Sequence, residues 1–212
     1  YKSDDFAPYI FKTEDYGKTW VKITNGIGAS HFTRAMRADK KVKGLLYAGT
    51  EYGMYISYDD GASWKSFQLN LPMVPITDLT IKENDLIVAT QGRSFWVLDD
   101  LSVAQEIVRT NNFNLTSKDV FVFPVNDAYR FDGFQNLNVK NAGMNPPNGT
   151  VINYWLKNVV DSPKVSIEIL DKNKKPIKLF ATNAKEKENK IDVSKGMNQF
   201  VWNMLYPPAD KI

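Results

Sequence analysis

The chain has 212 residues, of which 43% are hydrophobic and 24% charged, and this composition excludes a low-complexity or disordered chain. It contains no cysteine, which excludes a disulfide framework and a thiolate metal site, and no apolar run long enough to cross a membrane. The formal net charge is +3, and the lysines between positions 172 and 195 lack the interleaved arginines and aromatics of a nucleic-acid surface, so we expect a solvated face there.

Two short strands are predicted at the start, over residues 9–12 and 20–23, and an eight-residue pattern, T-x-D-x-G-x-T-W, joins them. The pattern returns as S-x-D-x-G-x-S-W, with its aspartate 59 − 15 = 44 residues later. A strand-turn-strand signal repeated every 40–50 residues or so is typical of β-propeller blades. The pattern residues are Thr13, Asp15, Gly17 and Trp20 in the first copy, and Ser57, Asp59, Gly61 and Trp64 in the second.

These residue types predict a structural turn. The glycines suit a positive φ, and the aspartate carboxylates and the leading hydroxyls accept or support hydrogen bonds across the hairpin. The tryptophans are expected to start the next strand and bury their rings against a neighbouring blade. A catalytic role for the aspartates is the alternative; we favour the structural role because turn-forming aspartates are far commoner.

The second repeat predicts four strands, over residues 32–37, 45–49, 54–58 and 64–67, and the third predicts strands over 76–82, 86–90 and 95–98. In the third repeat Asp99 aligns with Asp59 at an offset of 99 − 59 = 40, but Leu101 replaces the glycine and no tryptophan follows. We therefore expect this blade to lack its own outer strand or to take it from elsewhere. One half-blade, one full blade and one incomplete blade cannot close a propeller, so the chain is expected to be a fragment that packs against other blades.

Helical spacing of apolar residues predicts one short helix over 102–109, with Ser102 as its N-cap. A polar linker follows over 110–117. This gives three segments: 1–100, 101–118 and 119–212. Beyond the linker, short strands are predicted at 120–123, 150–156, 164–170, 177–180, 190–193 and 199–202, with a loop at 136–148. Short strands separated by polar turns favour an all-β sandwich.

The two eight-residue patterns are Asp-boxes. Together with residues 44–50 (GLLYAGT), 92–100 (GRSFWVLDD) and 143–147 (GMNPP), they resemble the bacterial sortilin-type, BNR-repeat propeller proteins that are labelled glycosyl hydrolases and are frequent in Bacteroidota. Residues 150–156, 165–171 and 196–203, the last with a G-x-N-x-F-x-W strand, resemble the Ig-like domain of flagellar hook-capping proteins. The resemblance implies an all-β chain of about two and a half propeller blades followed by an Ig/fibronectin-like β-sandwich. It also implies a secreted, periplasmic or cell-surface location.

Propellers usually bind ligands on the face opposite the box turns, which here comprises residues 26–32, 50–53, 70–75 and 91–94. Four of the candidates there also have a structural alternative: solvation for the histidine, ion pairing for the glutamate, loop packing for the tyrosine, and a structural bond to blade carbonyls for Arg93. One histidine, no cysteine and no D-x-D-x-D loop predict neither a metal site nor a cofactor. The candidates are His31, Arg34, Glu51, Tyr52, Gln91 and Arg93.

Two functions are therefore left open. The first is a non-catalytic extracellular module that binds glycan or protein ligands, with the remaining blades of the same protein as its partners. The second is part of a glycoside hydrolase, in which two carboxylates would act as general acid and base in the inverting geometry. No position in the chain matches the sequence context of either acid, so no catalytic residue is assigned.

Overall fold

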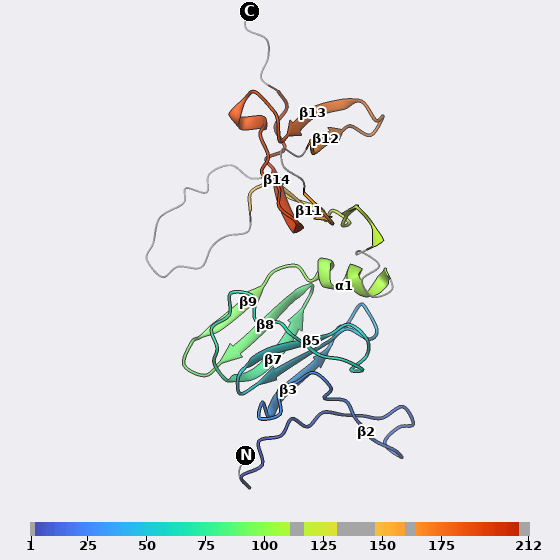
Figure 1. Ribbon diagram of the computed structural model, residues 1–212, viewed down its shortest axis with the longest axis vertical. Helices are drawn as coiled ribbons and strands as arrows, with labels where there is room; N and C mark the ends of the chain where they lie inside the picture. Colours follow the sequence, from blue (N-terminus) through green and yellow to red (C-terminus); the bar gives the residue numbers. More distant parts are fainter. Residues whose placement is uncertain (1–2, 111–116, 131–146, 160–163, 208–212) are drawn as a thin grey trace, which may run out of the picture. The chain divides into compact units, whose positions relative to one another are not determined.

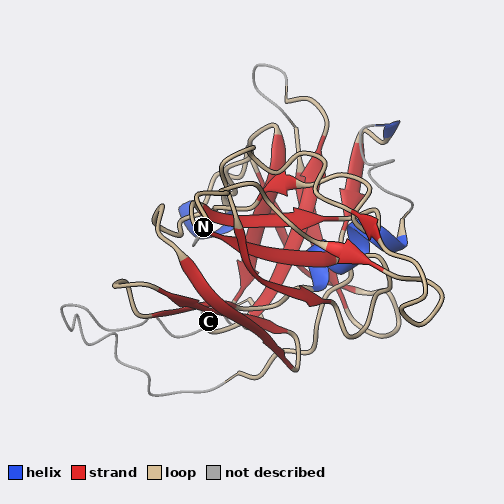
Figure 2. Cartoon of the chain, turned by 90° about the horizontal axis from the view of Figure 1, so that it is seen from below, coloured by secondary structure: helices blue, strands red, loops and turns tan. Residues whose placement is uncertain are grey.

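A computed structural model describes residues 3–110, 117–130, 147–159 and 164–207 of the chain. The chain divides into two compact units, Tyr1–Phe113 and Asn114–Ile212. Antiparallel strands and loops dominate, as Figure 2 shows, and the described residues contain one α-helix, α1 (Ser102–Arg109). The prediction of an all-β chain with one short helix at this position is confirmed. The predicted linker and the predicted loop at 136–148 lie mostly outside the described residues.

The first unit contains three successive antiparallel sheets, each built from neighbouring strands in chain order (Figure 1). Their strands fall at the predicted positions, and the strands at residues 11–12, 21–22 and 65–66 are each two residues shorter than predicted. The sheets are the hairpin β1 (Phe11–Lys12)–β2 (Val21–Lys22), the four-stranded sheet β3 (Thr33–Ala38)–β4 (Leu46–Thr50)–β5 (Gly53–Ser57)–β6 (Lys65–Ser66), and the three-stranded sheet β7 (Ile76–Lys82)–β8 (Asp85–Thr90)–β9 (Phe95–Leu98).

The sequence repeat is also a repeat of backbone hydrogen bonds. The amide of Ile23 donates to the carbonyl of Ile10, and 44 residues later the amide of Phe67 donates to Met54, both at 2.9 Å. The pairing of β3 with β4 and that of β7 with β8 each have an irregularity directly after the first residue pair, between Thr33 and Ala35 and between Ile76 and Asp78. Each sheet is therefore one copy of the same unit, of which the hairpin represents the last two strands.

In the third copy, however, strand β9 is shifted by one residue relative to the sequence alignment. Leu46 pairs with Ser57, whereas Leu86 pairs with Leu98, so β8 lies 86 − 46 = 40 residues after β4 but β9 lies 98 − 57 = 41 after β5. The turn between β8 and β9 contains the extra residue. The structural counterpart of Asp59 is therefore Asp100, not Asp99 as the sequence alignment predicts.

Hydrogen bonds at the neighbouring turn bear out this shift. The amide of Asp60 donates to Gly44 at 2.8 Å, and the amide of Leu101 donates to Asn84 at the same distance. The left-handed residue, however, lies one position earlier in the third turn: it is Asp100, with φ of 61°, whereas in the second repeat it is Asp60, the residue after Asp59, with φ of 59°.

Helix α1 takes the place in chain order that β6 occupies in the preceding copy. The prediction that Ser102 caps this helix is wrong: Ser102 is its first residue, and Leu101 holds the N-cap position without a capping side chain. The carboxylate of Asp100 instead accepts hydrogen bonds from the amide of Ser102 at 2.9 Å and from its hydroxyl at 2.8 Å. Asp100 directly precedes the N-cap residue, and its carboxylate accepts the Ser102 amide, which has no acceptor within the helix.

The main core lies between the second and third sheets and extends to α1. Gly49 allows the closest approach, since a Cβ there would lie 2.5 Å from the side chain of Ile76. Gln105 of α1 is buried and its amide donates to Asp39 and to Asn84 at 3.1 and 2.9 Å. The buried cluster comprises Val42, Leu45, Tyr47, Met54, Ile56, Ile76, Leu79, Ile81, Leu86, Val88, Leu101 and Ala104.

The second unit has a three-stranded antiparallel sheet, ordered β10 (Val120–Val122), β11 (Thr150–Leu156) and β14 (Gly196–Trp202), and a hairpin of β12 (Ser166–Leu170) and β13 (Pro176–Ala181). The rings of Phe180 and Phe200 join the two sheets at 4.7 Å. A short 3₁₀ turn, η2 (Lys187–Asn189), precedes the predicted strand at 190–193. In that segment Lys190 forms one isolated bridge with Ala181, so the strand prediction is wrong there.

Candidate functional site

The first Asp-box forms a closed set of local hydrogen bonds. The Asp15 carboxylate accepts the amide and the hydroxyl of Thr19 at 2.8 and 2.7 Å, and the hydroxyl of Thr13 at 2.9 Å. The Thr13 hydroxyl in turn accepts the amide of Gly17, whose φ of 90° suits glycine. The hydrogen bonds from Thr19 and Thr13 hold the pKa of Asp15 below its usual value, against a smaller opposing effect of burial.

The second box repeats this set of contacts. The Asp59 carboxylate accepts the amide and the hydroxyl of Ser63 at 2.8 and 2.5 Å and the hydroxyl of Ser57 at 2.8 Å, and Gly61 has φ of 87°. Burial raises the pKa of Asp59, but the hydrogen bonds from Ser63 and Ser57 outweigh it and the pKa lies below its usual value. In both boxes the carboxylate is bonded within its own turn, as the structural interpretation requires.

The tryptophans of the two boxes differ in burial. Trp64 is 3% exposed; its indole N–H donates to the carbonyl of Ile23, and its amide donates to Asn25, both at 2.8 Å. It therefore joins the second sheet to the preceding hairpin. Trp20 is 58% exposed and its indole N–H donates to Gly17 of its own turn at 3.1 Å. The expectation that both rings are buried is right for Trp64 and wrong for Trp20, because no described residue covers that side of the hairpin.

The candidate ligand loops lie at the strand ends away from the box turns. In the second sheet the amide of Glu51 donates to Phe32 at 3.1 Å, and in the third the amide of Gln91 donates to Pro75 at 2.9 Å. The loop entering each sheet and the loop between its second and third strands therefore meet at one end. These two loop pairs carry five of the six candidate residues, and Arg34 lies at the start of β3, directly after the loop that enters the second sheet.

His31 is held by two tyrosines and a glycine. The hydroxyl of Tyr55 lies 2.8 Å from Nδ1 of His31 and also accepts the amide of Gly28 at 3.3 Å. The ring of Tyr52, which is 48% exposed, lies 4.7 Å from the imidazole at an angle of 34°. A Cβ at Gly28 would lie 2.8 Å from the imidazole. The histidine ring is therefore fixed in orientation and has an aromatic neighbour that faces solvent.

An ion pair adjoins this aromatic group. The guanidinium of Arg34 contacts one carboxylate oxygen of Glu51 through Nε at 2.6 Å and Nη2 at 2.5 Å, and both side chains are 26% exposed. Arg34 also lies over the ring of Phe32, at 5.0 Å from its centre, and Phe32 contacts Phe6 at 6.2 Å. For Glu51 the structure shows the ion-pair alternative.

Four of the six predicted residues thus lie at one end of the second sheet in two sets of contacts, one around His31 and one around the Arg34–Glu51 pair, and we call the two sets together the His31 cluster. It comprises Phe6, His31, Phe32, Arg34, Glu51, Tyr52 and Tyr55. Gln91 and Arg93 lie on the β8–β9 turn, are exposed, and have no described contact with this cluster. The backbone carbonyl of Arg93 accepts the indole N–H of Trp96 at 2.8 Å.

Three members of the cluster are absent from the sequence candidates. The sequence could have indicated Tyr55, since a tyrosine in an otherwise apolar buried strand requires a hydrogen-bond partner for its hydroxyl. It could not have indicated Phe6 and Phe32, because exposed aromatic residues in loops are common. Partly exposed aromatic rings beside a charged pair provide stacking surfaces and directional hydrogen bonds, which suits a sugar or a peptide.

No group of three or more histidine, aspartate or glutamate side chains in the described part of the chain is placed to hold a metal ion. Nor does that part contain a helix of the length and apolarity needed to cross a membrane. No protein-family model matches the chain, and no curated protein matches it.

Proposed function

We propose that this chain is a segment of a β-propeller followed by an Ig-like sandwich, and that it acts as an extracellular module for binding and assembly. The observation that carries the proposal is the junction between the first two repeats, where Trp64 of one Asp-box is buried on the preceding hairpin. Successive sheets that each dock on the one before are the construction principle of propellers. The contact between Phe180 and Phe200 supports a two-sheet sandwich in the second unit.

The exposed ends of the repeat series support assembly with further blades. Met54 and Ile56 of β5 are 2% and 1% exposed because the third sheet covers them, whereas their counterparts on β9, Phe95 and Val97, are 75% and 54% exposed. Apolar sheet faces of this kind are normally covered. We assign their cover to remaining blades of the same protein, consistent with secretion or display at the cell surface.

The His31 cluster is the proposed ligand site. Tyr52 offers an exposed ring for stacking on a sugar or an aromatic side chain, and the Arg34–Glu51 pair fixes the edge of the site. A hydrolase would need two carboxylates on either side of the scissile bond. Glu51 is bound to Arg34, so binding without turnover is the function that the contacts favour.

The experiment is a glycan array followed by calorimetry on the hits, using the whole chain. Tyr52→Ala should weaken binding by tenfold or more, whereas Tyr129→Ala, a change at an 86%-exposed tyrosine in the second unit, should leave it unchanged. Equal binding by both variants would reject the His31 cluster as the site. Release of reducing sugar from a bound glycan would reject a purely binding function.

A further inference from the structure

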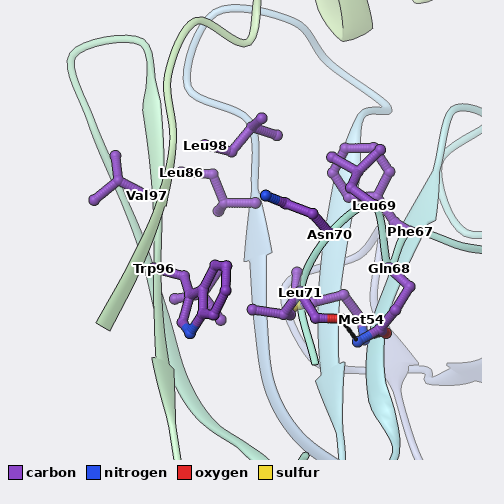
Figure 3. A pocket seen from close by; sticks show the side chains of 11 residues that line it. Met54, Phe67, Gln68, Leu69, Asn70, Leu71, Leu86, Trp96, Val97 and Leu98 are labelled. Carbon is purple, nitrogen blue, oxygen red and sulfur yellow. Dashed lines mark hydrogen bonds between the residues drawn. The ribbon is translucent and has the colours of Figure 1, made fainter. Parts of the chain in front are cut away.

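A groove lies between the second and third sheets, beside strand β9 (Figure 3). Its empty space is about 390 Å³, a volume that includes the open solvent at its mouth. In Figure 3, Trp96 and Leu71 face one another across it. Its lining residues are Met54, Phe67, Gln68, Leu69, Asn70, Leu71, Leu86, Val88, Trp96, Val97 and Leu98.

The repeat shows what fills the same space one copy earlier, because six of these lining residues correspond to residues packed around Trp64. Hydrogen bonds and registers shared by the copies establish the correspondence: the turn amide of Leu71 donates to Gln68 just as that of Ile27 donates to Thr24. The counterparts of Ile10, Ile23, Ile27, Leu46, Ala48 and Tyr55 around Trp64 are Met54, Phe67, Leu71, Leu86, Val88 and Trp96 around the groove.

Among the residues that the structure describes, none fills in the third repeat the space that Trp64 fills in the second, since the chain continues from β9 into α1 and not into an outer strand. The carbonyls that Trp64 uses, those of Ile23 and Asn25, correspond to the carbonyls of Phe67 and Leu69 at the groove. The groove therefore keeps the apolar lining of a tryptophan site.

Strand β9 also keeps an unpaired edge beside the groove within the described residues. The amide of Thr90 donates to Ser94, so in the antiparallel pattern Ser94, Trp96 and Leu98 bond to β8, while the backbone groups of Phe95 and Val97 point to the open edge. In the second sheet the corresponding positions, Met54 and Ile56, pair with the strand that carries Trp64.

One difference between the two sites affects how close an incoming backbone can come. Gly26 lies against the backbone of Trp64, where a Cβ would come within 2.3 Å of the Trp64 carbonyl, and Asn70 stands at the corresponding position beside the groove. Figure 3 shows the Asn70 side chain extending toward Leu86. An incoming backbone is therefore held farther from this turn than Trp64 is, and its hydrogen bonds come mainly from β9.

We propose that this groove and the edge of β9 together bind an extended peptide strand of another polypeptide, which pairs with β9 and inserts a tryptophan between Leu71, Leu86 and Trp96. Addition of a strand to a sheet edge gives main-chain hydrogen bonds, and the pocket for one side chain gives specificity. The site lies on the second and third repeats and does not depend on the ligand proposed for the His31 cluster.

The probe is a synthetic peptide with the sequence of residues 62–68, ASWKSFQ, which is this chain's own outer strand, and its control has alanine at the tryptophan position. Titrated into the whole chain, the tryptophan peptide should bind saturably and at least tenfold more tightly than the alanine peptide. Equal binding of the two peptides, or no binding of either, would overturn the proposal.

The strand contact is tested separately with Val97→Pro, which removes an amide that faces the open edge and is the kind of proline that edge strands tolerate. It should abolish peptide binding, and Val97→Thr should preserve it. Peptide addition to the wild-type chain should also slow hydrogen exchange at the amides of Phe95 and Val97, a measurement that stands even if the proline variant fails to fold. Unchanged exchange would overturn the strand contact. Concentration-dependent self-association abolished by Trp20→Ala would identify a second copy as the occupant instead.

Discussion

Replacing Trp64 with alanine tests whether the repeats stabilise one another. The ring is 3% exposed, and removal of a buried tryptophan typically costs about 3–5 kcal/mol. The lost hydrogen bond leaves the carbonyl of Ile23 without its indole donor, a loss of about 1 kcal/mol that is already part of this range. Trp64→Phe, which keeps most of the apolar contact and loses the N–H, should cost about 1–2 kcal/mol.

Trp20→Ala is the matched control, because Trp20 holds the same position in the other Asp-box but is 58% exposed. Its replacement should cost under about 1 kcal/mol. The difference between the two alanine variants is then about 3 kcal/mol, or roughly a hundredfold in the unfolding equilibrium constant, since each 1.4 kcal/mol is a factor of ten.

The assay is urea unfolding followed by pulsed hydrogen exchange and mass spectrometry, which separates peptides of residues 3–110 from those of 117–207. This separation matters because a chain of two units need not unfold in one step. Only the first unit should lose stability in Trp64→Ala. Equal losses for Trp20→Ala and Trp64→Ala, or a loss below about 1 kcal/mol for Trp64→Ala, would refute the view that the buried tryptophan joins the repeats.

Two further predictions concern the carboxylates of the turns. Asp100→Ala should destabilise the first unit by about 1–2 kcal/mol more than Asp99→Ala, because Asp100 accepts hydrogen bonds from Ser102 and Asn84. Equal melting temperatures of the two variants would favour the alignment in which Asp99 is the counterpart of Asp59. Since hydrogen bonds hold the pKa of Asp15 and Asp59 below the unfolded value of about 3.9, their stabilisation is present above that pH and is lost as the pH falls through the folded pKa. The melting temperature should therefore fall between about pH 5 and 3, and less steeply in an Asp15→Asn/Asp59→Asn double variant; an unchanged slope would contradict the low pKa values.

The sequence predicted the strands of the first unit because they alternate apolar and polar residues or form short apolar runs between turn residues. Local patterns determine such features. The hydrogen bonds of Asp15 and Asp59 are local in the same sense, since every donor lies within four residues of the carboxylate. Features that depend on a distant partner were predicted less well: Trp20 and Trp64 have the same local sequence, and only the surrounding chain decides which ring is buried.

The candidate site shows the same division. His31, Glu51 and Tyr52 lie in loops and Arg34 at a strand start, all at one end of the strands, and pairing of the strands brings these segments together. The contact of His31 with Tyr55, and that of Phe32 with Phe6, which is 48% exposed, depend on how segments far apart in the sequence fold over one another. The one-residue shift of β9 was hidden for a different reason, because an alignment without gaps gave a plausible match to the aspartates.

The number of residues in the β8–β9 turn determines on which face of the third sheet each side chain of β9 lies. Side chains of a strand alternate between its two faces, so a turn one residue shorter would turn every side chain of β9 to the opposite face. Trp96 would then leave the groove, and Phe95 and Val97 would enter it. The length of a surface turn, rather than the composition of the strand, thus determines whether this face of the protein carries an indole-lined groove or a stripe of phenylalanine and valine.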